Sequence, residues 1–331
     1  MTPGKGPSRT GVTAIIPFTD YFLQRAVAGV FVLNGAGELA GVTQVQEWGL
    51  LETPILLTNT MSVGKVSDAV VKWMTRRQPG IGQEFDVIIP VVGECDDSYL
   101  NDAVGRHIRS EHVYRAIESA APGPVMEGSV GAGTGMITCD FKSGIGTSSR
   151  RVRIDCDDSD ATSTFTLGVL VESNFGVMPN LRVDGVPVGE LLLPSYRDIA
   201  RRTHTYGSII VVVAIDAPLL APQIARLCKR AALGIGRAGS YAAHGSGELV
   251  IGFSTVNRIP RISRGMTHKL DVLLDRATGP LYEAAIEATE EAVVNSLCAA
   301  DEMVGRDGHC APGLPLDRLV EFMTRYRPPQ A

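Results

Sequence analysis

The 331-residue sequence predicts a layered α/β domain, in which helices cover the faces of β-sheets. Two observations lead to this prediction. Residues 209–215 form an apolar run without alternation, which is typical of a strand buried on both faces. Directly after it, apolar residues recur at helical spacing from Leu220 to Ala231, as expected of a helix that lies on a sheet. Periodicity alone does not decide between a three-layer and a four-layer arrangement.

In the first half of the chain the pattern predicts four strands and one helix. The expected strands are residues 11–17, 29–33, 55–58 and 85–92, and the expected helix is 66–76. Asn34-Gly35, directly after the second strand, is typical of the tight turn of a hairpin. Residues 143–163 are rich in Gly, Ser and Asp, so we expect loops there around a single strand, 152–156.

The second half continues the alternation of strands and helices. Strands are expected at 165–175, 209–215 and 248–255, and helices at 220–234, 281–303 and 315–326. Asp184-Gly185 predicts a second hairpin turn, Asp216 is expected to cap the helix after it, and Gly234 to end that helix. Four glutamates of the helix 281–303 lie largely opposite its apolar face and predict a solvated surface: Glu283, Glu287, Glu290 and Glu291.

Composition excludes several classes of protein. The hydrophobic fraction of 44% and the charged fraction of 20% fit a chain with a large buried core. A formal net charge of -5, without basic clusters, argues against nucleic acid as a partner. No apolar run approaches the ~20 residues of a membrane helix, so we expect no membrane partner and a cytoplasmic location. The six cysteines show no metal-ligand spacing, and we expect neither a disulfide scaffold nor a metal or other cofactor.

The Gly207-Ser208 junction at the start of the apolar run has a chemical interpretation. If this peptide bond broke, Ser208 would carry both a hydroxyl nucleophile and a free α-amine as its base. An unperturbed α-amine has a pKa of ~7.7–8.0, so a useful fraction is neutral at pH 7. Glycine at position 207 leaves the strained geometry of an N-to-O acyl shift sterically open. Taken by itself, however, Gly-Ser before a strand is usually only a turn.

Motifs spread over nearly the whole chain favour the chemical interpretation. They are RTGVTAIIP (9–17), LETPILLTNTMSVG (51–64), SVGAGTGM (129–136), ESNFG (172–176), YGSIIVVVAIDAPLL (206–220), SGE (246–248) and GRDGH (305–309). In this set and order they resemble the L-aminopeptidase/D-Ala-esterase/amidase family, which includes the β-aminopeptidases. The resemblance implies a four-layer αββα sandwich and a single catalytic domain over residues 1–331. It also implies self-cleavage between Gly207 and Ser208 into an α chain of residues 1–207 and a β chain of residues 208–331, and a homo-oligomer of such αβ units.

The resemblance also implies roles for polar residues around Ser208, the expected nucleophile. Ser246 and Glu248 stand two apart in an extended segment, so their side chains share one face about 6–7 Å apart; the matching family residues orient the nucleophile and assist proton transfer. Asn174 matches the family residue whose amide donates to the oxyanion. Local sequence alone would allow a surface turn at Ser246 and Glu248, and an Asx-turn cap at Asn174.

Two acidic residues are expected to bind the substrate. In the family, the residue that matches Glu94 helps to hold the free ammonium of the substrate. The position two residues later is aromatic in relatives but is Asp96 here. This departure leaves three alternatives open: a more acidic site, an aromatic role for Tyr99, or an altered activity.

The sequence therefore leaves two functions to be weighed. The first is a self-processing serine aminopeptidase/amidase that acts on short peptides, amides or esters with a free amine through an acyl-enzyme on Ser208. The second is an unprocessed, catalytically silent relative that serves as a binding or structural protein. Within the enzyme class, the sequence does not choose among L-amino acid amides, D-alanine esters and β-amino acid peptides.

Overall fold

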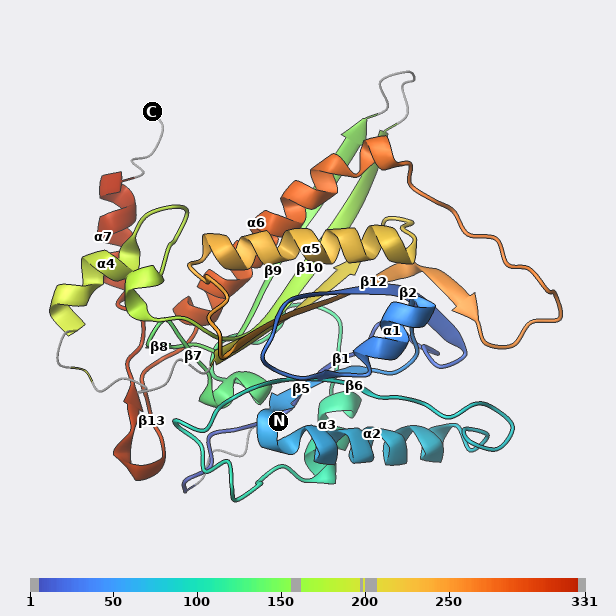
Figure 1. The fold of residues 1–331 in the computed structure, drawn as a ribbon, viewed down its shortest axis with the longest axis horizontal. Helices are drawn as coiled ribbons and strands as arrows, with labels where there is room; N and C mark the ends of the chain where they lie inside the picture. The colour runs from blue at the N-terminus through green and yellow to red at the C-terminus, as the bar shows by residue number, and fades with distance from the viewer. Residues whose placement is uncertain (1–5, 156–161, 197–198, 200–206, 327–331) are drawn as a thin grey trace.

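The computed structural model describes residues 6–155, 162–196, 199 and 207–326 (Figure 1). Within these residues the strands form two larger sheets and two short pairs, β7–β8 and β13–β14. The short pairs are Ile137–Thr138 with Phe141–Lys142, and Met303–Val304 with Cys310–Ala311. Helices lie outside both larger sheets (Figure 1).

The larger sheet has the order β4-β2-β12-β11-β10-β9. Its strands are β4 (Leu50–Leu51), β2 (Gln24–Gly35), β12 (Ser246–Pro260), β11 (Gly207–Ile215), β10 (Thr162–Asn174) and β9 (Ile145–Asp155). Strand β11 is parallel to β12 and antiparallel to β10. The apolar run of the sequence is therefore an interior strand of the sheet, as predicted.

The smaller sheet has the order β1-β5-β6-β3. Its strands are β1 (Thr13–Ile15), β5 (Ile55–Asn59), β6 (Val91–Cys95) and β3 (Leu39–Ala40). Strands β5 and β6 are parallel, and their carboxyl ends, Asn59 and Cys95, are paired with each other. Side chains that follow or end these two strands therefore gather at one edge of this sheet.

Three apolar layers separate the sheets and helices. Along β11, Ile209 and Val211 belong to the layer under helices α5 and α6, whereas Ile210 and Val212 belong to the layer between the two sheets. A third layer packs the outer face of the smaller sheet, including Leu56, against helices α2 and α3. Burying one such side chain contributes ~1.5–3 kcal/mol relative to exposure. The order helix, sheet, sheet, helix is the predicted four-layer αββα sandwich.

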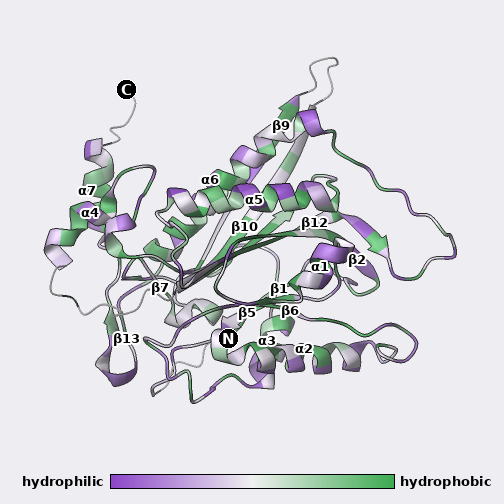
Figure 2. Ribbon diagram, viewed as in Figure 1, coloured by the Kyte–Doolittle hydropathy of each residue, from purple (hydrophilic) through white to green (hydrophobic). Residues whose placement is uncertain are grey.

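The outer helices pack their apolar faces on the two sheets. Helices α5 (Ala221–Arg237) and α6 (Gly279–Cys298) cover the larger sheet, and α2 (Val63–Arg77) and α3 (Ser110–Glu118) the smaller one. Figure 2 shows apolar residues along β10 and β12, and mixed apolar and polar faces on α2 and α5, as expected of helices that pack on one side. The remaining helices are α1 (Val42–Trp48), α4 (Val188–Leu192) and α7 (Leu316–Tyr326).

Gly234 does not end α5, contrary to the prediction. It lies inside the helix at the crossing with α6, where a Cβ atom would stand 2.4 Å from the carbonyl oxygen of Ile286. Glycine is therefore needed at this position for close helix packing. Asp216 does not cap α5 either, because its carboxylate accepts a hydrogen bond from Thr166 N at 2.6 Å and the helix begins five residues later.

Four other expectations require correction. Asn34-Gly35 is the end of the long strand β2, not a tight turn. Only the end of the expected strand 85–92 is extended, because pairing with β5 begins at Val91. The Gly- and Ser-rich segment expected as loops contains the eleven-residue strand β9, which pairs with β10 along its whole length. The helix expected at 281–303 is α6 and ends at Cys298.

The acidic row of α6 is not simply a solvated face. Arg150 of β9 forms ion pairs with Glu287 and Glu291 at 3.2 Å and 2.5 Å, and Arg237 of α5 approaches Glu290 at 3.5 Å. These contacts explain why α6 lies along the β9–β10 ribbon in Figure 1. The expected turn at Asp184-Gly185 is confirmed by reciprocal hydrogen bonds between Val183 and Val186. Within the described residues, no helix combines the length and apolar character needed to cross a bilayer.

Candidate active site

The polar residues singled out in the sequence meet at one end of the larger sheet. Ser208 is the second residue of β11, and Ser246 begins β12. Asn174 is the last residue of β10 and the register partner of Ser208. Glu94, the second-last residue of β6, approaches from the smaller sheet. Together with residues of neighbouring loops, Ser208, Glu94 and Asp96 line a cavity of about 420 Å³.

Ser208 lies at the buried wall of this cavity, with 5% of its surface exposed. Its hydroxyl oxygen accepts a hydrogen bond from Gly247 N at 3.3 Å. Gly207 has no positive φ, so its backbone conformation is one that other residues adopt. Glycine is needed there because a Cβ atom would stand 2.4 Å from the carbonyl oxygen of Asn174. Close packing, and not backbone freedom, thus explains the glycine before the serine.

Ser246 and Glu248 form a buried pair on one face of β12, as the i, i+2 spacing predicted. The Ser246 hydroxyl donates to Glu248 Oε1 at 2.6 Å, and Ser240 donates to the same oxygen at 3.2 Å. Ser246 is the register partner of Gly207, so it lies beside the Gly207–Ser208 peptide. Burial raises the pKa of Glu248 above its usual range, while the two hydroxyl donors oppose this shift.

Asn34 holds the start of β12 in place, a role that its expected position in a turn did not suggest. Its side-chain amide donates to the carbonyl oxygens of Ser246 and, at 2.8 Å, Ala243. The strand that carries the Ser246–Glu248 pair is thereby tied to the end of β2.

The side-chain amide of Asn174 has a defined orientation. Its Oδ1 accepts a hydrogen bond from Ile137 N at 2.8 Å, so its Nδ2 must be the opposite atom, and that atom donates to the Asp96 carbonyl oxygen at 2.8 Å. The donor group of Asn174 therefore faces the segment that lines the cavity. A backbone carbonyl uses one of the two Nδ2 hydrogens.

Glu94 is buried and accepts two hydrogen bonds. Thr60 Oγ1 donates to its Oε2, and Glu38 N donates to its Oε1 at 2.8 Å. Burial raises the pKa of Glu94 above its usual range, and the two donors hold this shift back. Thr60 belongs to a quoted motif, but its contact with Glu94 depends on the pairing of β5 with β6 and has no local signal.

Gly37 brings the serine and the carboxylate to a common point. A Cβ atom at this glycine would stand 3.3 Å from both Ser208 Oγ and Glu94 Oε1. The two oxygen atoms therefore flank the same small space. A side chain larger than hydrogen at position 37 would occupy it.

Asp96 lines the cavity, and its carboxylate accepts a hydrogen bond from Ser98 N at 2.9 Å. Tyr99 is not among the lining residues. Its ring stacks on His309, with the ring centroids 4.6 Å apart, and packs against Leu100. Of the three alternatives for this position, the geometry favours a more acidic site over an aromatic role for Tyr99.

Two fully buried ionisable groups near the site were not singled out in the sequence, although Glu172 begins the motif ESNFG. Glu172 lies two residues before Asn174 on β10, and neither of its carboxyl oxygens has a hydrogen-bond partner. Lys142 donates from its Nζ to the carbonyl oxygens of Met136 at 2.9 Å, Gly133 at 3.3 Å and Ser143. These carbonyls belong to the segment that presents Ile137 N to Asn174.

Comparison with known proteins identifies the class of hydrolase fold and the peptidase family of this chain. The model of peptidase family S58 matches residues 2–311. The structure superimposes on the L-aminopeptidase D-Ala-esterase/amidase of Ochrobactrum anthropi, described as a variant of the Ntn hydrolase fold, with a TM-score of 0.88 and 37% identity, covering 98% of this chain and 88% of that one. The fold is therefore that of an Ntn-type hydrolase. The chain belongs to peptidase family S58.

Two further relatives cover the chain equally well. The beta-peptidyl aminopeptidase BapA of Sphingosinicella microcystinivorans is 43% identical over 98% of this chain and 82% of its own length. The PH0078 protein of Pyrococcus horikoshii OT3 has a TM-score of 0.89 at 42% identity, covering 98% of this chain and 88% of that one. Family membership makes the protein a peptidase/amidase hydrolase. Identity this high over nearly the whole chain argues against a catalytically silent relative.

Proposed function

We propose that the chain cleaves itself between Gly207 and Ser208 and then acts as a serine aminopeptidase/amidase. The products are an α chain of residues 1–207 and a β chain of residues 208–331. The observation that carries the proposal is that Ser208 Oγ and Glu94 Oε1 flank one point in a single cavity. A nucleophile and an ammonium-binding carboxylate on two sides of one small space suit a substrate whose free amine is close to the bond that breaks.

Self-cleavage begins with attack of Ser208 Oγ on the carbonyl carbon of Gly207. The bond between that carbon and the Ser208 nitrogen breaks, the nitrogen takes up the hydroxyl proton, and an ester joins the two residues. This step already frees the α-amine of Ser208. Water then hydrolyses the ester, which leaves a carboxylate on Gly207 and restores the Ser208 hydroxyl. Support comes from Ser246, which is paired with Gly207 and hydrogen-bonded to Glu248, and which can relay the proton.

Hydrolysis of the substrate follows the same chemistry. Ser208 Oγ attacks the substrate carbonyl while the α-amine of Ser208 takes its proton, and the leaving amine departs with that proton. Water then hydrolyses the acyl-enzyme. Ser246 and Glu248 orient the nucleophile and its amine. Asn174 Nδ2 donates to the oxyanion, since Ile137 fixes the amide with its donor toward the cavity.

Glu94 binds the ammonium of the substrate, with Asp96 as a second negative group in the cavity. Hydrogen bonds from Thr60 and from the Glu38 backbone hold the Glu94 carboxylate in place. Among the substrate classes that the sequence left open, the 43% identity to a beta-peptidyl aminopeptidase favours β-amino acid peptides and amides.

We also propose that the processed αβ units form a homo-oligomer and work in the cytoplasm. The five described cysteines are free, and three of them are buried, which suits a reducing compartment. Light scattering of the purified protein measures the oligomer, and fractionation of the native host measures the location.

Processing is tested by denaturing electrophoresis and mass spectrometry. The wild-type protein should give two fragments that begin at Met1 and Ser208, whereas Ser208→Ala should give the intact chain. Ser240→Ala, which removes only the second hydroxyl donor to Glu248, is the matched control and should still be cleaved. An intact wild-type chain that hydrolyses aminoacyl amides would overturn the processing step.

Substrate class is tested with p-nitroanilides of L-alanine, D-alanine and β-alanine, each with a free or an acetylated amine. Hydrolysis of the free forms only is expected, with β-alanine preferred. Equal rates on the acetylated compounds would exclude the proposed role of Glu94.

A further inference from the structure

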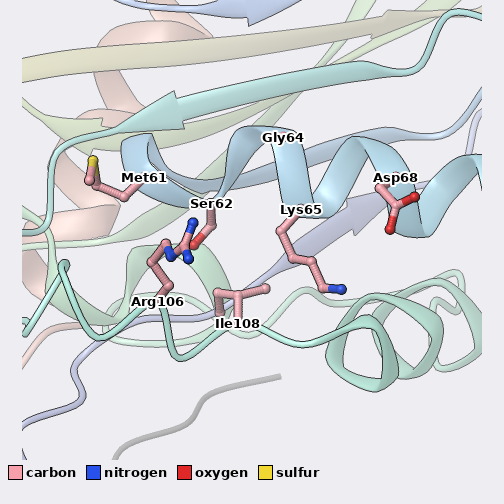
Figure 3. Close-up of a pocket in the computed structure, with 7 residues that line it drawn as sticks. All are labelled: Met61, Ser62, Gly64, Lys65, Asp68, Arg106 and Ile108. Atoms are coloured by element: carbon pink, nitrogen blue, oxygen red, sulfur yellow. The ribbon is translucent and has the colours of Figure 1, made fainter.

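A second cavity adjoins the one over Ser208. It has a volume of about 550 Å³ and is drawn in Figure 3. Its lining residues are Met61, Ser62, Gly64, Lys65, Asp68, Arg106 and Ile108. Met61 lines both cavities, so they are neighbours along one side of the molecule.

Two segments pass both cavities. On one side the 3₁₀ turn Thr60–Ser62 places Thr60 at the first cavity and Ser62 at the second. On the other side the loop 103–108 places Val104 at the first and Arg106 at the second. A substrate chain that leaves Ser208 between these segments therefore reaches the second cavity.

The second cavity is positively charged. Lys65 and Arg106 extend toward the space between α2 and the opposite loop (Figure 3), and neither forms an ion pair within the part of the chain that the structure describes. The one carboxylate in the lining, Asp68, is paired with Lys72 at 2.7 Å. The charge of Asp68 is thus already balanced, and two cations remain for a ligand.

The wall of the cavity also offers neutral donors. Helix α2 begins here, and the first N–H groups of a helix have no partner within it. Ser62 stands at the N-cap position, yet its side chain makes no capping hydrogen bond. Ser62 is only 2% exposed, and its hydroxyl has no hydrogen-bond partner among the described residues. Because Ser62 lines the cavity, its hydroxyl is open to a ligand there, and a free hydroxyl in a wall with two cations suits an anionic group.

The loop that carries Arg106 is held closed. Asp102 accepts a hydrogen bond from Gly105 N at 3.2 Å and pairs with His107 Nε2 at 3.1 Å. Arg106 N donates to the carbonyl oxygen of Ala103 at 3.2 Å. The guanidinium is therefore presented from a defined turn.

We propose that this second cavity binds the C-terminal carboxylate of a short peptide substrate. Ser62, Lys65 and Arg106 receive the carboxylate on one side of Ser208, while Glu94 receives the ammonium on the other. The preferred substrates are then short peptides with both ends free, in preference to amides or esters with an uncharged leaving group. This inference rests on the proposed aminopeptidase activity and names its substrate class.

The test compares two peptides that differ only in the charge of the C-terminus. They are X-Ala-Ala with a free carboxylate and the same peptide with a C-terminal amide, where X is the residue preferred among the p-nitroanilides. Each is measured with the wild-type enzyme and with Lys65→Met, Arg106→Met and the double variant. Arg109→Met removes an exposed cation close by that does not line the cavity, and is the matched control.

In the double variant, kcat/KM for the free acid is expected to fall about tenfold, mainly through KM, because each exposed charge contributes a few-fold. Hydrolysis of the amide should change less than twofold in every variant, which also reports correct folding. Equal losses on acid and amide, or no loss on either, would overturn the carboxylate site while leaving the aminopeptidase intact. If the wild-type enzyme hydrolyses neither peptide nor any p-nitroanilide, the proposed function itself fails, and the carboxylate site with it.

Discussion

Glu172 allows a quantitative test of the interior next to the site. Its side chain is fully buried and neither carboxyl oxygen has a hydrogen-bond partner. Burial raises the pKa of Glu172 well above its usual range, and the negative charges of Glu94 and Asp97 raise it further. The native protein therefore holds the proton of Glu172 more tightly than the unfolded chain, which loses that proton near pH ~4.3.

The sign of the effect follows from proton linkage. Between the unfolded pKa and the raised native pKa, the native state binds one proton more than the unfolded state, so the free energy of unfolding falls as pH rises. One proton corresponds to 1.36 kcal/mol per pH unit. Each pH unit inside this window should thus cost the protein up to about 1.4 kcal/mol of stability.

The substitution Glu172→Gln removes this dependence, because glutamine has the same shape and does not titrate. We expect its stability relative to wild type to improve as pH rises from 5 to 7, by up to about 1.4 kcal/mol for each pH unit. Urea unfolding at pH 5, 6 and 7 measures the difference, with both proteins in the Ser208→Ala background so that each is a single chain. The exposed Glu283→Gln on α6 is the control and should show no such trend. A constant difference between Glu172→Gln and its parent at all three pH values would show that Glu172 is ionised in the folded protein.

Four further predictions concern the site. Glu94→Gln should raise KM for free-amine substrates. In the wild type, KM should rise as pH falls through the raised pKa of Glu94, because the protonated carboxyl no longer attracts an ammonium. Steady-state kinetics from pH 5 to 8 measures both effects. Asn174→Ala should lower kcat about 10²–10³-fold, as for a lost oxyanion donor. Gly207→Ala should leave uncleaved precursor on a denaturing gel, because its Cβ would stand 2.4 Å from the Asn174 carbonyl, whereas Gly236→Ala, with open space around it, should be cleaved normally. Burial lowers the pKa of Lys142 to about 7. Between pH 7 and pH 10 the unfolded chain therefore binds one proton more than the native protein, and the stability of the wild type should rise with pH. In thermal unfolding, the stability of Lys142→Met should not show this rise.

The elements that local pattern predicted best are those whose environment is uniform. Strand β11 is apolar at every position because apolar layers cover both of its faces. Only the end of strand β9 was predicted, as 152–156, because its stability comes from pairing with β10 and from packing under α6, not from its Gly- and Ser-rich sequence. Gly234 was misplaced for a related reason, since the atom that requires a glycine there belongs to α6, about fifty residues away.

The residues of the candidate site also divide into those that the sequence named and those that only the structure revealed. Ser208, Ser246, Glu248, Asn174 and Glu94 were all named from the sequence. The fold places the first four at one end of the larger sheet, and Ser208 and Glu94 line one cavity. Their roles in catalysis remain predictions to be tested. Glu172 begins the motif ESNFG and Lys142 lies in no quoted motif, but neither was singled out, because the burial of an ionisable group is decided by the neighbours that exclude water from it.

The order of residues along the chain thus determined the family, the serine beside the bond that we predict to be cleaved and the interior strand that carries it, because these depend on short stretches of sequence. Only the tertiary structure decided that Gly37 separates the nucleophile from Glu94, that the amide donor of Asn174 points at the Asp96 carbonyl, and that two cations border a second cavity next to the first. Each of these facts is a contact or a space between segments far apart in the sequence. Such contacts are set by how the sheets and helices pack, and no local pattern records them.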